Sequence, residues 1–316
     1  MLEPPAPWLR HHPSAWRAGT LDVARLRSAA DALRQRPGFL QEVQHFAACW
    51  QAGYESHPVL PSAMRNNARY VMMVACLWLD HVRDPTRPTE SITQARLLAF
   101  YERLGRGLVS ASPWRVKAML GHARASGLLQ PMAHVGDARW RPLEPTPALR
   151  EAMACWTAGF LRGLAPVLSL PEPPERMVQR PGLVGEVFTY RLSALLEDRY
   201  AITVGLPAMR WVTDREKGYH LFLSLMRGVA LQPDGSALAL VAPQELAQRS
   251  GLARNTVRNF IQACVSQGWA EAQADNRLRL TPGFVDEALH WFGLEFVWMH
   301  TLAVAAWQRL RPGWQA

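Results

Sequence analysis

The sequence predicts a mainly α-helical protein with small β-hairpins, in which a unit of helix, turn, helix, hairpin and helix occurs twice. Apolar residues recur at helical spacing along most of the 316 residues, and only two short zones, 128–143 and 269–280, read as strands. The segments that end in these zones also resemble each other. This similarity indicates an internal duplication.

The duplication becomes visible when the chain is shifted by 141 positions, which places 116–128 on 257–269. Both segments carry apolar residues at i, i+3, i+4 and i+7, then a glycine (Gly127 or Gly268), then a hydrophobic residue that starts a strand. Each copy continues with two arginines around one apolar residue and then Thr-Pro, a helix cap with proline at the first helical position. One insertion in the hairpin keeps the register.

Further helices are expected on both sides of these copies. Three precede the first copy, over 20–35, 39–54 and 62–81, and two more lie near 184–196 and 217–229. The apolar run 292–307 is interrupted by Glu295 and His300 and is shorter than the roughly 20 residues that span a bilayer. We therefore expect a buried C-terminal helix there.

The stretch 171–174, which contains three prolines, is the predicted domain boundary. The first seven residues do not read as a signal peptide, so a cytoplasmic location is expected. The expected organisation is an N-terminal helical platform (1–88), a degenerate first unit (89–170), a linker with connecting helices (171–213) and a second unit (214–316) that includes the buried C-terminal helix.

The order helix, turn, helix, hairpin, helix is that of a winged helix-turn-helix, so the fold class expected is tandem winged helix-turn-helix domains on a helical platform. The segment Leu246–Val257 reads Leu-Ala-x-x-Ser-Gly-Leu-x-x-x-Thr-Val and resembles helix-turn-helix bacterial transcription regulators. The hairpin arm that runs into 280–283 is similar to the wing and following helix of the MarR-type family. The resemblance implies DNA binding and transcription regulation. MarR-type proteins have one such domain per chain and act as dimers, whereas this chain has two.

The second copy carries the clearer candidate for reading DNA. Its segment 253–267 is the second helix of the helix-turn-helix, the element that enters the major groove. No acidic residue occurs between Arg249 and Gln267, whereas an ordinary exposed helix mixes signs. Arginine can contact guanine, and asparagine or glutamine can contact adenine. The residues predicted to contact DNA are Arg254, Asn255, Thr256, Arg258, Asn259 and Gln262 on the helix and Arg277 and Arg279 on the hairpin.

The first copy has the same scaffold with a poorer hydrogen-bonding face, which lacks asparagine and glutamine. Arginines of the hairpins suit phosphates or a narrow minor groove. The alternative interpretation is a solvated polar helix face for the second copy, and packing within the protein for the first. The residues of this copy predicted to contact DNA are Trp114, Arg115, Lys117, Arg139 and Arg141.

Charge supports a polyanionic partner, since the chain carries a formal net charge of +9. Of this net charge, segment 110–141 contributes +4 and segment 249–279 contributes +3. A membrane-binding protein would place such charge on one long basic amphipathic helix, and the sequence predicts no such helix. Motifs typical of enzymes are lacking, such as a Gly-rich phosphate loop, HExxH or GxSxG, so neither catalysis nor a cofactor is expected. The four dispersed cysteines predict buried reduced thiols. His45 and Cys49 have ligand spacing but no second pair in register, so no metal is expected.

The leading hypothesis is a sequence-specific transcription regulator that binds double-stranded DNA as an intramolecular pseudo-dimer of winged helices. One alternative is a plasmid replication initiator, since those proteins also have tandem winged helices. The other is a protein–protein scaffold in which the charge is incidental. A homodimer and an unidentified small-molecule effector stay open as further partners.

Overall fold

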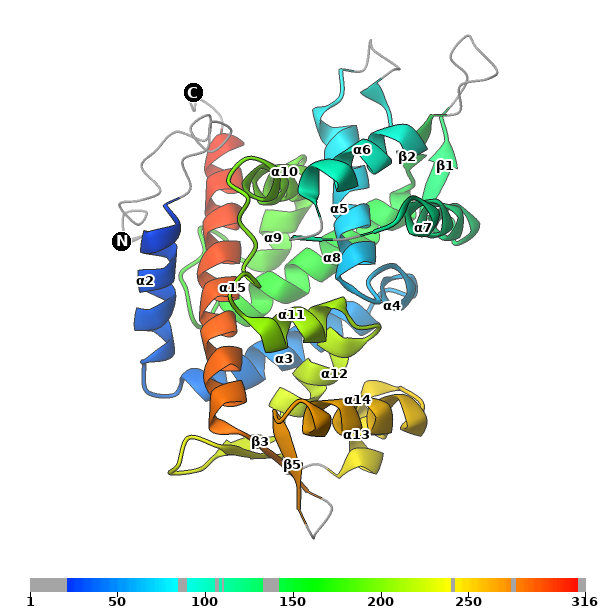
Figure 1. The fold of residues 1–316 in the computed structure, drawn as a ribbon. Helices are drawn as coiled ribbons and strands as arrows, with labels where there is room; N and C mark the ends of the chain where they lie inside the picture. The colour runs from blue at the N-terminus through cyan, green and yellow to red at the C-terminus, as the bar shows by residue number, and fades with distance from the viewer. Residues whose placement is uncertain are drawn as a thin grey trace.

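The computed structural model describes residues 22–84, 90–105, 108–109, 111–132, 142–239, 242–273 and 277–311. These residues form a mainly helical protein with two small antiparallel sheets, which confirms the coarse fold class (Figure 1). The elements of the N-terminal half are α2 (Val23–Arg34), α3 (Phe39–Glu55), α4 (Leu60–Ala63), α5 (Asn67–Val82), α6 (Gln94–Leu104), α7 (Pro113–Ala125), β1 (Leu129–Pro131), β2 (Leu143–Pro145) and α8 (Pro147–Leu164).

The C-terminal half contains the larger sheet and the longest helix. The connecting helices are α9 (Pro174–Gln179), α10 (Leu183–Leu196) and α11 (Pro207–Asp214). They are followed by α12 (Gly218–Met226), β3 (Val229–Leu231), β4 (Ala237–Ala239), α13 (Pro243–Ser250), α14 (Arg254–Ser266), β5 (Ala270–Ala272), β6 (Leu278–Leu280) and α15 (Pro282–Arg309). Below, the first unit means α5 to α8 and the second unit means α12 to α15.

Side-chain caps define where several of these helices begin. The side chains of Asp22, Asn66, Thr93, Ser112 and Thr146 each accept a hydrogen bond from the amide three residues further on. Such a cap satisfies one of the amides that a helix N-terminus leaves without an internal partner. The cap at Asn66 also corrects the sequence prediction, because it separates α4 from α5 where one helix over 62–81 was expected.

The prediction that only two zones form strands was also wrong. Val229 starts a third zone, β3, which pairs with β4 as a hairpin just after α12. The four strands run in the order β3-β4-β6-β5, so β4 from before α13 lies beside β6 from after α14. A strand of three residues has too little alternation to be recognised from sequence, and its pairing partner decides its structure.

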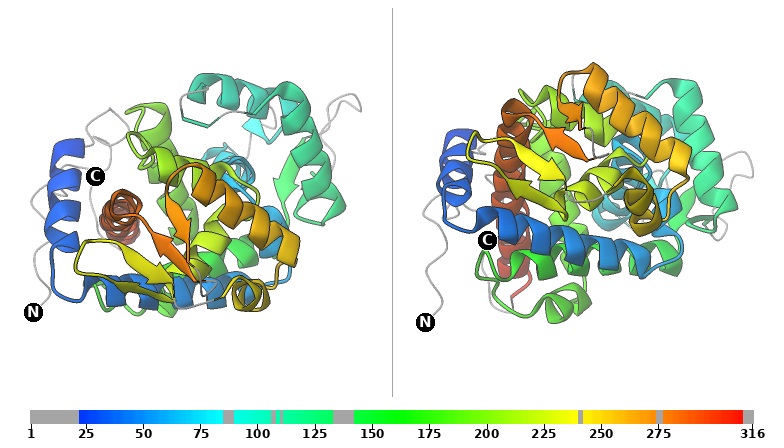
Figure 2. Two further views of the ribbon diagram at one scale, coloured as in Figure 1. Left: turned by 60° about the horizontal axis from the view of Figure 1, so that its bottom comes forward. Right: turned by 90° about the horizontal axis from the view of Figure 1, so that it is seen from below.

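A single hydrophobic core joins the two halves of the chain. It extends from Leu26 to Trp307 and lies on both sides of the Pro-rich stretch 171–174, which connects α8 to α9. Helix α15 runs through the molecule beside α2 and α10, and α3 crosses α8 (Figures 1 and 2). The expected burial of 292–307 is confirmed, since nearly all of its residues are buried. Within the described ranges, no helix has both the length and the apolar content needed to cross a lipid bilayer.

Candidate nucleic-acid interface

The second unit presents α14 at one end of the molecule, beside the hairpin β5–β6 (Figures 1 and 2). Helix α13 ends at Gly251, whose positive φ of 62° allows the chain to turn, and α14 begins at Arg254. Inside the unit, Leu246 of α13 and Val257 and Phe260 of α14 are buried. This packing holds α14 in a fixed orientation, with one face against the core and the other in solvent.

The exposed face of α14 carries the residues that the sequence analysis singled out. Thr256 is half-buried, and Nη2 of Arg258 donates a hydrogen bond to Oδ1 of Asn255 at 3.2 Å. Among the described residues, no carboxylate pairs with Arg254 or Arg258. The face is therefore cationic and rich in amide groups at the N-terminal half of the helix. Its exposed members are Arg254, Asn255, Arg258, Asn259 and Gln262.

The second hairpin carries the two arginines Arg277 and Arg279 that were predicted to contact DNA. Leu278 between them is buried, so Arg277 and Arg279 lie on one face of the strand, as the alternation predicts. Arg279 forms an ion pair with Asp234 in the β3–β4 turn, and its Nε donates to Oγ of Ser236 at 3.1 Å. Hydrogen bonds from Ser236, together with Arg279, lower the pKa of Asp234. The sequence did not indicate this pair, because it did not predict the hairpin that carries Asp234.

Equivalent hydrogen bonds connect the end of the helix before the hairpin to the start of the helix after it in both units. Gly127 and Gly268 have positive φ angles of 67° and 70°, directly after α7 and α14. Oγ1 of Thr146 donates to the Gly127 carbonyl at 2.7 Å, and Oγ1 of Thr281 donates to the Gly268 carbonyl at 3.3 Å. The glycines and the threonines that align in the repeat therefore make matching contacts.

The third strand of the second unit also has a counterpart in the first. Ala239 of β4 pairs with Leu278 of β6. At the matching place, Ile92 forms a bridge with Leu143 of β2, whose amide donates to the Ile92 carbonyl at 2.8 Å. Each unit thus contains a helix, a short extended segment, two helices, a hairpin and a long helix, with the extended segment beside the second hairpin strand.

The reading face expected in the first unit is less complete. Trp114 in the first turn of α7 is 77% exposed, Lys117 is exposed and Arg115 is half-buried. Arg139 and Arg141, which were also predicted to contact DNA, lie outside the described residues. Residues 105–112 separate α6 from α7, so the tight turn of the second unit is not reproduced here.

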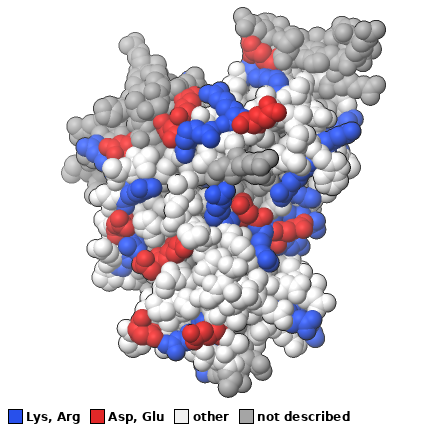
Figure 3. Space-filling model, in the orientation of Figure 1, with Lys and Arg blue, Asp and Glu red and all other residues white. Residues whose placement is uncertain are grey.

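Two basic side chains that the sequence analysis did not single out, Arg65 and Arg69, lie near Arg115 of α7. Arg69 on α5 donates from Nη1 to the Ser62 carbonyl at 3.2 Å, and Arg65 pairs with Glu216 at 3.0 Å. Burial lowers the pKa of Arg69, and the nearby Arg65 and Arg115 lower it further. We call Arg65, Arg69 and Arg115 the basic cluster. Most charged side chains along the right-hand edge of the view in Figure 3 are basic.

The cysteines and histidines of the described chain form no metal centre of three or more ligands. Cys76 and Cys264 are buried as expected, whereas Cys49 and Cys155 are half-buried. Burial raises the pKa of both Cys76 and Cys264 to about 12, which keeps these thiols protonated at neutral pH. The Sγ atom of Cys49 lies 3.4 Å from Nε2 of His45, so this pair is satisfied by a contact within one helix.

Comparisons with protein-family models, with curated proteins and with solved structures found no match to this chain.

Proposed function

We propose that this protein is a sequence-specific, double-stranded DNA-binding regulator of transcription, in which both units are winged helices. The observation that carries the proposal is the exposed face of α14, where two arginines that pair with no carboxylate of the described residues lie beside three amide side chains. Helix α14 follows the glycine turn at Gly251 and lies beside the hairpin β5–β6, which is the arrangement expected of a recognition helix and its wing.

The chemistry of this face suits the major groove. An arginine can donate two hydrogen bonds to O6 and N7 of guanine, and an asparagine or glutamine can bond N6 and N7 of adenine. Arg254 and Asn255 lie in the first turn of α14, and Arg258 and Asn259 follow one turn later on the same face. Two successive turns can thus reach neighbouring base pairs. We assign base reading to α14.

The first unit would act mainly through phosphates. The basic cluster lies between α7 and the second unit, since Arg65 contacts Glu216 just before α12. Contacts of this kind fix the register on DNA without reading the sequence. The molecule would then work as an intramolecular pseudo-dimer with one discriminating arm and one mainly electrostatic arm.

The test is to select binding sites from a random double-stranded pool and then measure affinity by fluorescence anisotropy over a range of salt concentrations. We expect Arg258→Ala to weaken binding by about 1–3 kcal/mol and to relax specificity at one position. Arg25→Ala is the matched control, because this exposed arginine lies on α2, far along the chain from α14. No binding at low salt, or equal losses in the two variants, would contradict the proposal.

The location of the selected sites separates regulation from replication. Sites at promoters support a regulator, whereas iterated repeats beside a replication origin would make the protein an initiator. A scaffold role predicts instead that the double variant Arg258→Ala, Arg277→Ala keeps the function intact in cells.

Trp114 favours a second role for the first unit, namely contact with another protein. A tryptophan that is 77% exposed in the first turn of a helix is unusual, and tryptophan is enriched among the residues that dominate protein interfaces. Trp114→Ala should then leave the affinity of the purified protein for DNA nearly unchanged while reducing regulation in cells. A large loss of DNA affinity would place Trp114 on the DNA instead.

A further inference from the structure

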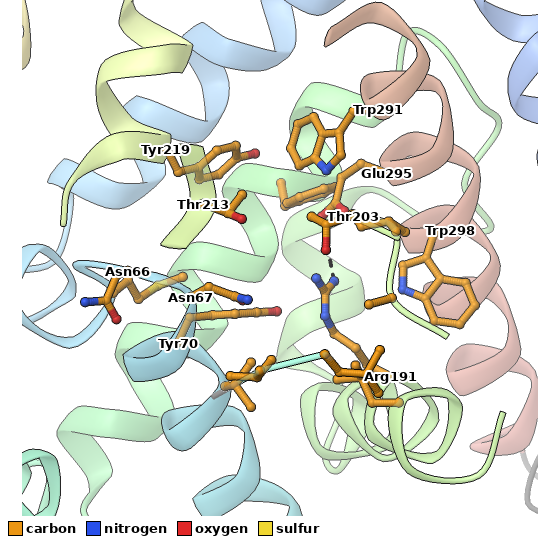
Figure 4. A pocket seen from close by; sticks show the side chains of 18 of the residues that line it. Asn66, Asn67, Tyr70, Arg191, Thr203, Thr213, Tyr219, Trp291, Glu295 and Trp298 are labelled. Carbon is orange, nitrogen blue, oxygen red and sulfur yellow. Dashed lines mark ion pairs between the residues drawn. The ribbon is translucent and has the colours of Figure 1, made fainter. Parts of the chain in front are cut away.

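A cavity of about 110 Å³ lies inside the helical body, where α5 of the first unit faces α12 and α15 of the second (Figure 4). Asn66, Thr203 and Thr213 also line it. It shares no residue with the exposed face of α14. The aromatic residues in its wall include Trp50, Trp156, Trp291, Trp298, Tyr70 and Tyr219.

An ion pair forms one side of this cavity. Nη1 of Arg191 lies 3.7 Å from Oε1 of Glu295, and the two side chains are only 15% and 5% exposed. The guanidinium carbon of Arg191 lies 5.2 Å from the centre of the Tyr70 ring. Burial raises the pKa of Glu295, and the neighbouring Arg191 opposes that rise. The charges of Arg191 and Glu295 therefore nearly cancel, and aromatic side chains surround the pair.

Several buried polar atoms of this wall have no hydrogen-bond partner among the described residues. They include Oε2 of Glu295, Nε1 of Trp291 and the hydroxyls of Tyr70 and Tyr219. The side chains of Tyr219, Arg191 and Glu295 all line this cavity (Figure 4). Folded proteins pair nearly all buried polar atoms, because an unpaired one loses its hydrogen bonds to water without replacement. A group of them around one cavity therefore indicates a ligand that supplies the partners.

We propose that the cavity binds a small, flat, neutral heteroaromatic molecule that has an N–H donor next to a ring-nitrogen acceptor. The N–H would donate to Oε2 of Glu295, and the ring nitrogen would accept from Nε1 of Trp291 or a tyrosine hydroxyl. The ring itself would lie among the aromatic side chains. A charged ligand is disfavoured because Arg191 already balances Glu295.

The enclosed volume agrees with a single ring. An apolar cavity of about 150 Å³ in another protein holds benzene, so about 110 Å³ suits at most one ring, and a second fused ring would extend into the opening of the cavity.

The experiment uses the full-length protein without DNA, so its result does not depend on the proposed function. The probes are 7-azaindole, which has adjacent donor and acceptor nitrogens, and indole, which has the same shape and only the donor. Binding is measured by isothermal titration calorimetry. We expect 7-azaindole to bind about tenfold more tightly than indole, because an unmet hydrogen bond is lost with indole.

Two variants locate the site. Glu295→Gln should weaken 7-azaindole binding about tenfold, because the charged acceptor is lost. Glu287→Gln is the matched control on the same helix, where the carboxylate accepts from the Met209 amide outside the cavity. Tyr219→Phe is the second test should Glu295→Gln fail to fold, and it should also weaken binding. Equal affinity for the two probes, no saturable binding, or equal effects of the two glutamine variants would overturn the proposal.

Discussion

Replacing Gly163 with alanine tests how closely α3 and α8 pack. A Cβ atom at Gly163 would lie 2.7 Å from Cδ2 and 2.9 Å from Cα of Phe46. The Phe46 ring cannot move aside, because it packs against Phe160 and Phe296 at centroid distances of 4.7 and 4.8 Å. The helices must therefore separate. Overpacking of this kind costs about 1–3 kcal/mol, whereas the gain in helix propensity is at most about 1 kcal/mol.

The expected net result is a free energy of unfolding lowered by up to about 2 kcal/mol, measured by urea denaturation followed by far-UV circular dichroism. Gly121→Ala is the matched control, since Gly121 lies in α7 and a Cβ there meets nothing within 4 Å. That variant should gain about 0.5–1 kcal/mol from helix propensity alone. If both variants are stabilised, the close approach of α3 and α8 is refuted.

Two further predictions concern titration and charge. Burial lowers the pKa of His220 from 6.5 to about 4, so on acidification the unfolded chain takes up a proton at this side chain before the folded protein does. The free energy of unfolding is therefore unaffected by His220 above pH 6.5 and falls by about 3 kcal/mol toward pH 4. His220→Gln should remove most of this slope in unfolding titrations at several pH values, and an unchanged slope would exclude His220 as its source. Asp234→Asn releases Arg279 from its ion pair. Under the proposed function, DNA affinity should then rise and the slope of log K against log salt should steepen by about one, whereas an identical slope would show that Arg279 meets no phosphate.

Much of the helical framework follows from local sequence patterns. The predicted helix 39–54 corresponds to Phe39–Glu55, and the predicted helix 184–196 corresponds to Leu183–Leu196. Both patterns are long enough for the apolar stripe to specify a helix. The prediction over 62–81 missed the break at Asn66, because the apolar positions continue through it while the side chain of Asn66 caps a new helix.

The two parts of the candidate interface, the exposed face of α14 and the basic cluster, were predictable from the sequence to different degrees. The face of α14 follows from periodicity, since the buried stripe of Val257, Phe260 and Cys264 leaves the opposite side chains in solvent. Arg65 and Arg69 were missed because they lie far from Arg115 in the sequence, and the basic cluster forms only in the folded chain.

The sequence by itself determined the order of the helices, the two hairpins of the repeat and the composition of the exposed α14 face. These features depend on contacts within a few residues, which leave a periodic trace in the chain. Only the tertiary structure decided that β4 joins β6, that Arg279 is held by Asp234, and that Arg191 and Glu295 meet beside one cavity. Each of these pairings joins segments far apart in the sequence, and each depends on how the helices pack rather than on any local pattern.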